Sequence, residues 1–149
     1  MPSRIVRPET VKIDISNGDW LLVKKRLNAG EQRAMFARMY QAGADGVLHA
    51  NPFEVGVAQI LAYLLDWSMT GLDGKQIAIM GQPASVVLGA LDSFDGDTFA
   101  EIRKAIDEHI DAVTIERSLE KNALAGESRS VATSPSLSAA DGQSMSSVN

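Results

Sequence analysis

A long periodic apolar pattern in the second half of the chain is the feature that most constrains the fold. Its apolar residues recur at spacings of three and four, and they are Phe99, Ile102, Ile106, Ile110 and Val113. This spacing places them on one face of an α-helix. Thr98 and Glu101 fit a capping box at the start of that helix. Beyond Val113 the stripe fails, because Glu116 and Arg117 occupy the next inward positions.

A second capping box predicts a helix from about residue 29 to residue 41. Asn28 is suited to accept a hydrogen bond from the backbone of the first helical turn, and Glu31, three residues later, is placed to reach back to Asn28. Gly43 is the expected end, because glycine readily adopts the left-handed conformation that terminates helices.

Two proline residues mark the starts of further helices. Asn51 and Pro52 supply a cap and a first helical residue, and we expect the helix that follows to reach about Leu65. Apolar residues surround it almost completely, which predicts that it is the buried centre of the fold. Pro83 opens another helix, which ends near Phe94.

An alternating pattern near the N-terminus predicts strands instead. Val11, Ile13 and Ile15 alternate with polar residues, which is the period of a half-buried strand. Asn17-Gly18 supplies a turn signal, and the β-prone run at residues 20–23 follows it. These features predict an N-terminal β-hairpin.

The predicted fold class is therefore mainly α, with a small N-terminal β-hairpin and a single helical domain. We expect a flexible N-terminal arm at residues 1–9 and the globular domain at residues 10–124. Residues 127–149 hold eight serines and no aromatic residue. Such a segment buries too little apolar surface to offset the entropy lost on ordering. Residues 125–149 are predicted to be a disordered Ser-rich tail.

Composition and charge argue against several classes of partner. The net charge of −5 disfavours nucleic acid, because phosphate binding depends on a basic surface. The chain has no cysteine, which excludes disulfides and thiol nucleophiles and favours a reducing cytoplasm. No apolar run approaches the roughly 20 residues that a membrane span requires, so we expect no membrane partner.

No residue pattern indicates a catalytic, cofactor-binding or metal site. His49 and His109 lie on different predicted elements, and we interpret His49 as a loop residue and His109 as a packing residue. The twelve glycines form no phosphate-binding motif, and the tail serines have no neighbouring histidine to act as a base. The sequence predicts a protein that is not an enzyme and has no cofactor and no metal.

Flexible and aromatic apolar side chains are the remaining candidates for function. Methionine and aromatic residues are typical of adaptable protein interfaces. The candidate protein-binding residues are Met35, Phe36, Met39, Tyr40, Trp67 and Met69. For each of them, packing into the core is the alternative.

Three short segments carry a family resemblance, and they occur in a defined order. They are Gly-Asp-Trp-Leu-Leu-Val-Lys-Lys-Arg-Leu-Asn-Ala-Gly-Glu at 18–31, Tyr-Leu-Leu-Asp-Trp-Ser-Met-Thr at 63–70 and Asp-Gly-Lys at 73–75. A helical start of the Asp-Thr-Phe-Ala-Glu-Ile type follows at 97–102. With these motifs, roughly residues 10–122 resemble the tail assembly chaperones of long-tailed (siphovirus-type) bacteriophages.

This resemblance implies a non-catalytic helper that works in the host cytoplasm and is absent from the mature virion. Such a protein binds the phage tape measure protein and helps recruit subunits of the tail-tube protein around it. The family offers no catalytic residues to transfer. The alternative is a structural component of the phage tail or neck that stays in the virion. The sequence leaves open whether the chain forms a homo-oligomer.

Overall fold

The computed structural model describes residues 3–128 and is mainly α-helical, as the sequence predicts. Within these residues, four α-helices accompany five short strands, which form a three-stranded and a two-stranded antiparallel sheet. Residues 3–9, where the N-terminal arm is predicted, form neither helix nor strand.

The first hairpin comes from the alternating apolar pattern. β1 (Thr10–Asp14) pairs antiparallel with β2 (Trp20–Lys24), and a short 3-10 turn, η1 (Ser16–Gly18), joins them. Asn17 and Gly18 in this turn have positive φ angles of 59° and 77°, which asparagine and glycine adopt more readily than other residues. The pair agrees with the predicted N-terminal hairpin.

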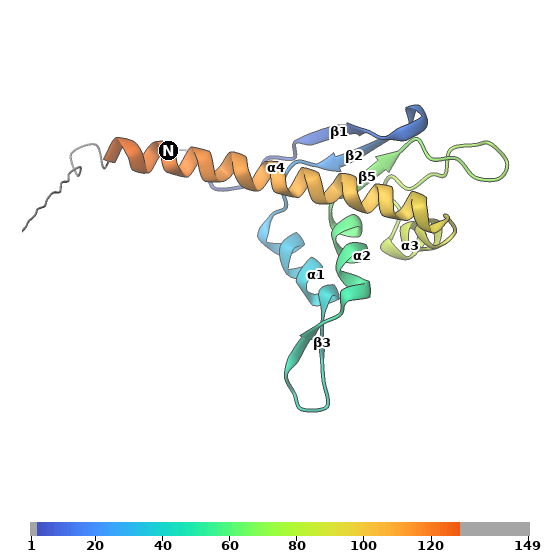
Figure 1. Ribbon diagram of the computed structural model, residues 1–149, viewed down its shortest axis with the longest axis horizontal. Helices are drawn as coiled ribbons and strands as arrows, with labels where there is room; N and C mark the ends of the chain where they lie inside the picture. The colour runs from blue at the N-terminus through green and yellow to red at the C-terminus, as the bar shows by residue number, and fades with distance from the viewer. Residues whose placement is uncertain (1–2, 129–149) are drawn as a thin grey trace, which may run out of the picture. The chain divides into compact units, whose positions relative to one another are not determined.

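A third strand, which the sequence did not predict, extends this sheet (Figure 1). β5 (Leu64–Trp67) pairs with the other edge of β2, so the strand order is β1-β2-β5. The predicted continuation of a helix to Leu65 was therefore wrong. Leu64 and Trp67 are buried in the core from this strand, and pairing with β2 outweighs the local helical pattern.

Helices α1 (Ala29–Met39) and α2 (Pro52–Tyr63) pack side by side (Figure 1). Both begin at the predicted caps. The predicted burial of α2 on all sides was wrong, because Phe53 in its first turn is 88% exposed. Side chains of the first turn have no preceding turn to pack against, and here no other element covers this one.

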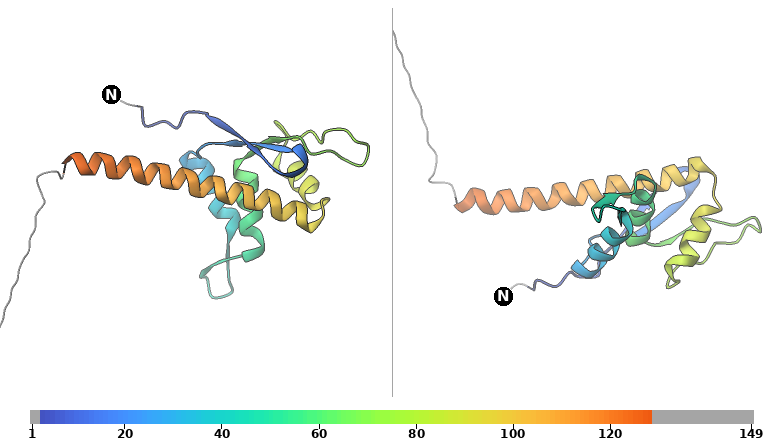
Figure 2. Two further views of the ribbon diagram at one scale, coloured as in Figure 1. Left: turned by 45° about the horizontal axis from the view of Figure 1, so that its top comes forward. Right: turned by 90° about the horizontal axis from the view of Figure 1, so that it is seen from below.

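The connection between α1 and α2 is a second hairpin that the sequence did not predict, and His49, interpreted as a loop residue, lies in one of its strands. β3 (Tyr40–Ala42) and β4 (Leu48–Ala50) pair antiparallel and extend beyond the ends of the two helices (Figure 2). The backbone N–H of Asn51 donates to the carbonyl of Met39 at 2.8 Å, which holds the end of α1 beside the start of α2. The predicted helix end at residue 41 was two residues too late.

Two further helices complete the described chain, α3 (Ala84–Asp92) and α4 (Gly96–Ser128). The cap of α4 is Asp95, whose carboxylate accepts the Thr98 backbone N–H at 2.8 Å and the Thr98 hydroxyl at 2.9 Å. The capping box predicted for Thr98 and Glu101 was wrong. Glu101 instead accepts a hydrogen bond from the Ser16 hydroxyl at 2.9 Å.

The apolar faces of the sheet, α2, α3 and the first half of α4 meet in one core. Its largest fully buried side chains are Leu21, Val23, Ile60, Trp67, Leu91, Ile102 and Ile106. The Trp67 ring contacts Phe94 edge-on with 5.3 Å between centroids, and its indole N–H donates to the carbonyl of Ile77 at 2.9 Å. Gly56 leaves room for Arg103 of α4, whose Nε atom would lie 2.6 Å from an added Cβ.

The chain divides into two units, and the boundary falls at Val113 inside α4. This is the residue after which the sequence stripe fails. In the second unit, Ile115, Leu119 and Leu124 are exposed. α4 includes residues 125–128, the first four of the predicted tail, and the rest of that tail lies outside the described residues.

His109 connects α4 to the end of β2. It is buried, its Nε2–H donates to the carbonyl of Lys24 at 2.9 Å, and its ring contacts Tyr63 edge-on with 5.8 Å between centroids. This agrees with the predicted packing role of His109.

We expect His109→Leu to lower the free energy of unfolding by about 1–3 kcal/mol, because the Lys24 carbonyl would lose its hydrogen-bond donor. Urea unfolding followed by circular dichroism measures the change. His109→Gln keeps a donor and should lose less. Equal losses in the two variants would show that ring packing, and not the hydrogen bond, is what stabilises this contact.

Candidate protein-binding surface

The structure does not bring the six predicted binding residues together on one surface. Met39, Trp67 and Met69 are buried in this conformation. Trp67 and Met69 belong to the main core cluster. For these three residues the structure shows the alternative of core packing, because each is a large apolar side chain that other parts of the chain cover. They are not accessible to a partner here.

The other three residues remain accessible: Met35 and Phe36 lie in the last turns of α1, and Tyr40 is the first residue of β3. Phe36 is 49% exposed and Tyr40 is 42% exposed. Their rings lie side by side with 6.4 Å between centroids. Met35 is half-buried and lines a cavity together with Lys24 and Glu31.

Two further exposed apolar residues, not singled out from the sequence, lie on the elements that follow. Leu48 in β4 is 67% exposed, and Phe53 at the start of α2 is largely uncovered. We call Phe36, Tyr40, Leu48 and Phe53 the hairpin cluster, because all four are carried by the β3–β4 hairpin or by the helices directly flanking it. The contact between Asn51 and Met39 keeps these flanking helix ends adjacent.

The register of the β3–β4 hairpin sorts its side chains by polarity. Residues directly opposite in an antiparallel pair point to the same face, and neighbours along a strand point to opposite faces. Tyr40 and Leu48 therefore share one face with two alanines, whereas Gln41 and His49 share the other. All six residues are exposed. This alternation around the glycines of the hairpin loop is the sequence signal that could have predicted the apolar face.

Positive charge accompanies the hairpin cluster on α1. Arg33 and Arg38 are both exposed. Neither makes an ion pair with any other residue of the described part of the chain. Their charge is therefore free to attract an acidic partner.

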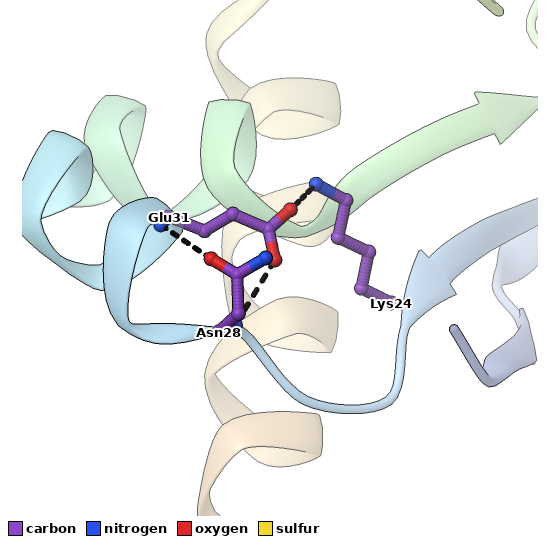
Figure 3. A network of polar contacts seen from close by, with 3 residues as sticks. All are labelled: Lys24, Asn28 and Glu31. Carbon is purple, nitrogen blue, oxygen red and sulfur yellow. Dashed lines mark hydrogen bonds and ion pairs between the residues drawn. The ribbon is translucent and has the colours of Figure 1, made fainter. Parts of the chain in front are cut away.

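A polar network holds the start of α1 against the end of β2 (Figure 3). Glu31 accepts the backbone N–H of Asn28 at 3.0 Å and pairs with the ammonium of Lys24, while the Asn28 side chain accepts the Glu31 N–H at 2.8 Å. Burial raises the pKa of the Glu31 carboxyl, whereas the hydrogen bonds from Asn28 and Lys24 and the charge of Lys24 lower it by a larger amount. The resulting pKa lies below its ordinary value.

The Lys24–Glu31 pair lines two cavities. The first has a volume of ≈ 250 Å³ and is also lined by α1 and α2 residues, among them Met35, Arg38 and Leu61. The second has a volume of ≈ 220 Å³ and includes residues 6–10 in its wall. Both are smaller than the roughly 300–1,000 Å³ of typical small-molecule sites.

The described residues hold no group of three or more His, Asp or Glu side chains placed to bind a metal ion. None of the helices within residues 3–128 combines the length and the apolar character needed to cross a bilayer. Comparison of the chain with protein-family models, with curated proteins and with solved structures found no match.

The Glu31 network gives a pH-dependent prediction. The pKa of Glu31 is lower in the folded protein than its ordinary value of 4.5. The stability that the carboxylate contributes is therefore fully present above that value and is lost as pH falls through the folded-state pKa. Glu31→Gln can keep the hydrogen bond to the Asn28 N–H but loses the charge that pairs with Lys24, so it should cost up to about 1 kcal/mol near neutral pH, and less in acid.

Urea unfolding of the wild type and the variant, at neutral pH and well below pH 4.5, measures this difference. Glu108→Gln, at an exposed carboxyl of α4 that lies 3.9 Å from the Lys104 ammonium, is the matched control and should change stability little at either pH. A cost for Glu31→Gln that does not shrink in acid would contradict a role for the Glu31 charge.

Proposed function

We propose that this protein is a phage tail assembly chaperone that binds the tape measure protein and helps recruit tail-tube subunits in the host cytoplasm. It acts without catalysis and leaves before the virion matures. Two observations support the proposal. One is the resemblance of roughly residues 10–122 to that family, and the other, which carries the physical argument, is the exposed hairpin cluster.

Exposed apolar side chains scattered singly are normal, whereas contiguous apolar patches mark interaction sites. Here Phe36 contacts Tyr40, and Tyr40 shares a hairpin face with Leu48. The hairpin cluster contains three aromatic residues and one leucine. Aromatic residues dominate the binding energy of protein interfaces, because they cover a large apolar area with few rotatable bonds. An apolar stripe on a client helix is the surface that such a cluster covers best.

The chemistry of the client follows from the same residues. A segment that matches the hairpin cluster presents apolar side chains at helical spacing, and Arg33 and Arg38 favour acidic residues beside that stripe. A tape measure protein is long and helical in this family, and it must be kept from aggregating until the tube covers it. A small contact of four side chains binds reversibly, which suits a helper that has to leave.

The double change Tyr40→Ser with Leu48→Ser tests the hairpin cluster directly. Both side chains are exposed on the same face of the β3–β4 hairpin, so the fold should survive. Affinity for tape measure fragments, measured by titration calorimetry, should fall by about tenfold or more. Leu72→Ser, at a fully exposed leucine in another turn, is the matched control and should leave affinity unchanged. A folded double variant that binds like the wild type would refute this site.

A second test asks where the protein is found during infection. We expect it in tail assembly intermediates and not in purified mature virions, because tube subunits replace it on the tape measure protein. Quantitative mass spectrometry of both fractions measures this. Stoichiometric amounts in mature particles would contradict the chaperone and support a structural component of the tail or neck.

A further inference from the structure

β1 forms a free edge of the three-stranded sheet, because only β2 pairs with it. The backbone groups that face β2 belong to the odd-numbered residues of this segment. This follows from the flanking bonds, in which the Ile15 N–H donates to Asp19 and the Lys25 N–H donates to Glu9, each at 2.9 Å, since hydrogen-bonded pairs recur every second residue in an antiparallel ladder.

The backbone N–H and C=O groups of Thr10, Lys12 and Asp14 therefore point away from the sheet. Within residues 3–128, no other segment makes a backbone hydrogen bond to them. β1 itself contains no proline, and the irregularity of this sheet lies between Leu22 and Val23, on the opposite side of β2. The free edge is thus regular enough to accept another strand.

The charges along β1 are complementary to a second copy of the same strand. Two copies related by a two-fold axis run antiparallel. When the axis passes through Ile13, Lys12 of each copy lies opposite Asp14 of the other. In the same register Ile13 meets its own counterpart and Val11 meets Ile15. These residues are only partly buried in the single chain, so pairing covers apolar surface that is now exposed.

This register also satisfies the backbone. Lys12 and Asp14, the residues that would face each other across the axis, are the ones whose backbone groups point outward. The competing register, with the axis through Lys12, places two lysines directly opposite each other, which is destabilising. Both registers satisfy the outward backbone groups and bring apolar residues opposite one another, so the charges select the alignment with Lys12 opposite Asp14.

We propose that the protein forms a two-fold dimer in which the β1 edges pair antiparallel and join the two three-stranded sheets into one. The occupant of the edge is a second copy of this chain. This interface is separate from the hairpin cluster, and the proposed dimer does not depend on the chaperone function.

A charge-swap experiment tests the pairing. Lys12→Asp places carboxylates opposite each other, and Asp14→Lys does the same with ammonium groups. Each single change alters two symmetric pairs and should weaken the dimer by about tenfold in sedimentation equilibrium of the full chain. The double variant, Lys12→Asp with Asp14→Lys, restores opposite charges and should regain dimer affinity close to that of the wild type.

The controls separate edge pairing from general charge effects. Lys104→Asp makes the same change in net charge at an exposed site on α4 and should not affect dimerisation. The double variant lacks the contact of the Lys12 ammonium with the Trp20 ring, 5.4 Å from the centroid. Asp14→Lys alone keeps that contact, so weakening of the dimer by this change would show that the cross-strand charges, and not the contact with Trp20, control association.

Amide hydrogen exchange of the wild type tests the same pairing without any variant, so it also applies if a variant does not fold. The outward N–H groups of Lys12 and Asp14 should become protected as protein concentration rises through the dimer range. Three results would each overturn β1 self-pairing. They are a chain that stays monomeric, a dimer in which these amides exchange as in the monomer, and protection that appears only when a tape measure fragment is added. So would single variants that leave the dimer unchanged.

Discussion

The burial of β2 is the constraint on which the other elements depend. Leu21 and Val23 point from this strand into the core with no exposed surface, and β1 and β5 pair along its two sides. Its last residue, Lys24, accepts a hydrogen bond from His109 at its carbonyl and pairs through its side chain with Glu31. A single strand thus sets the positions of both sheet neighbours, of α4 and of the start of α1.

The same constraint decides which apolar residues remain accessible. α1 turns its Met39 inward and leaves Phe36 facing solvent, and the chain then continues into β3 with Tyr40 exposed. Both β3 and β4 are uncovered on both faces, so the apolar face of their hairpin has no internal partner. The proposed protein binding at this hairpin would explain a cluster of aromatic residues that contributes little to the core.

Features encoded by neighbouring residues were predictable from the sequence. The Asn28 cap, the alternation in β1 and the stripe up to Val113 depend on contacts within a few residues or on simple periodicity. β5 was not predictable, because Leu64 to Trp67 becomes a strand only by pairing with β2, far away in sequence. The candidate site was predictable only in part, for the same reason. Residue type singled out Met39, Tyr40 and Trp67 alike, and only the packing of the whole chain separates the buried side chains from the exposed ones.

The pairing of β2 with β5 has a consequence for the order of folding. In the sequence, α1, the β3–β4 hairpin and α2 all lie between β2 and β5, which are neighbours in the sheet. This segment is therefore a long insertion whose two ends meet at the pairing of β2 with β5. Bringing the ends of such a long insertion together costs chain entropy before its contacts form. The hairpin of β1 and β2 is local and has no such cost. In a newly made chain, α1 and α2 therefore reach their final positions on the sheet only after β5 has docked, and the proposed binding of a client would follow completion of the sheet.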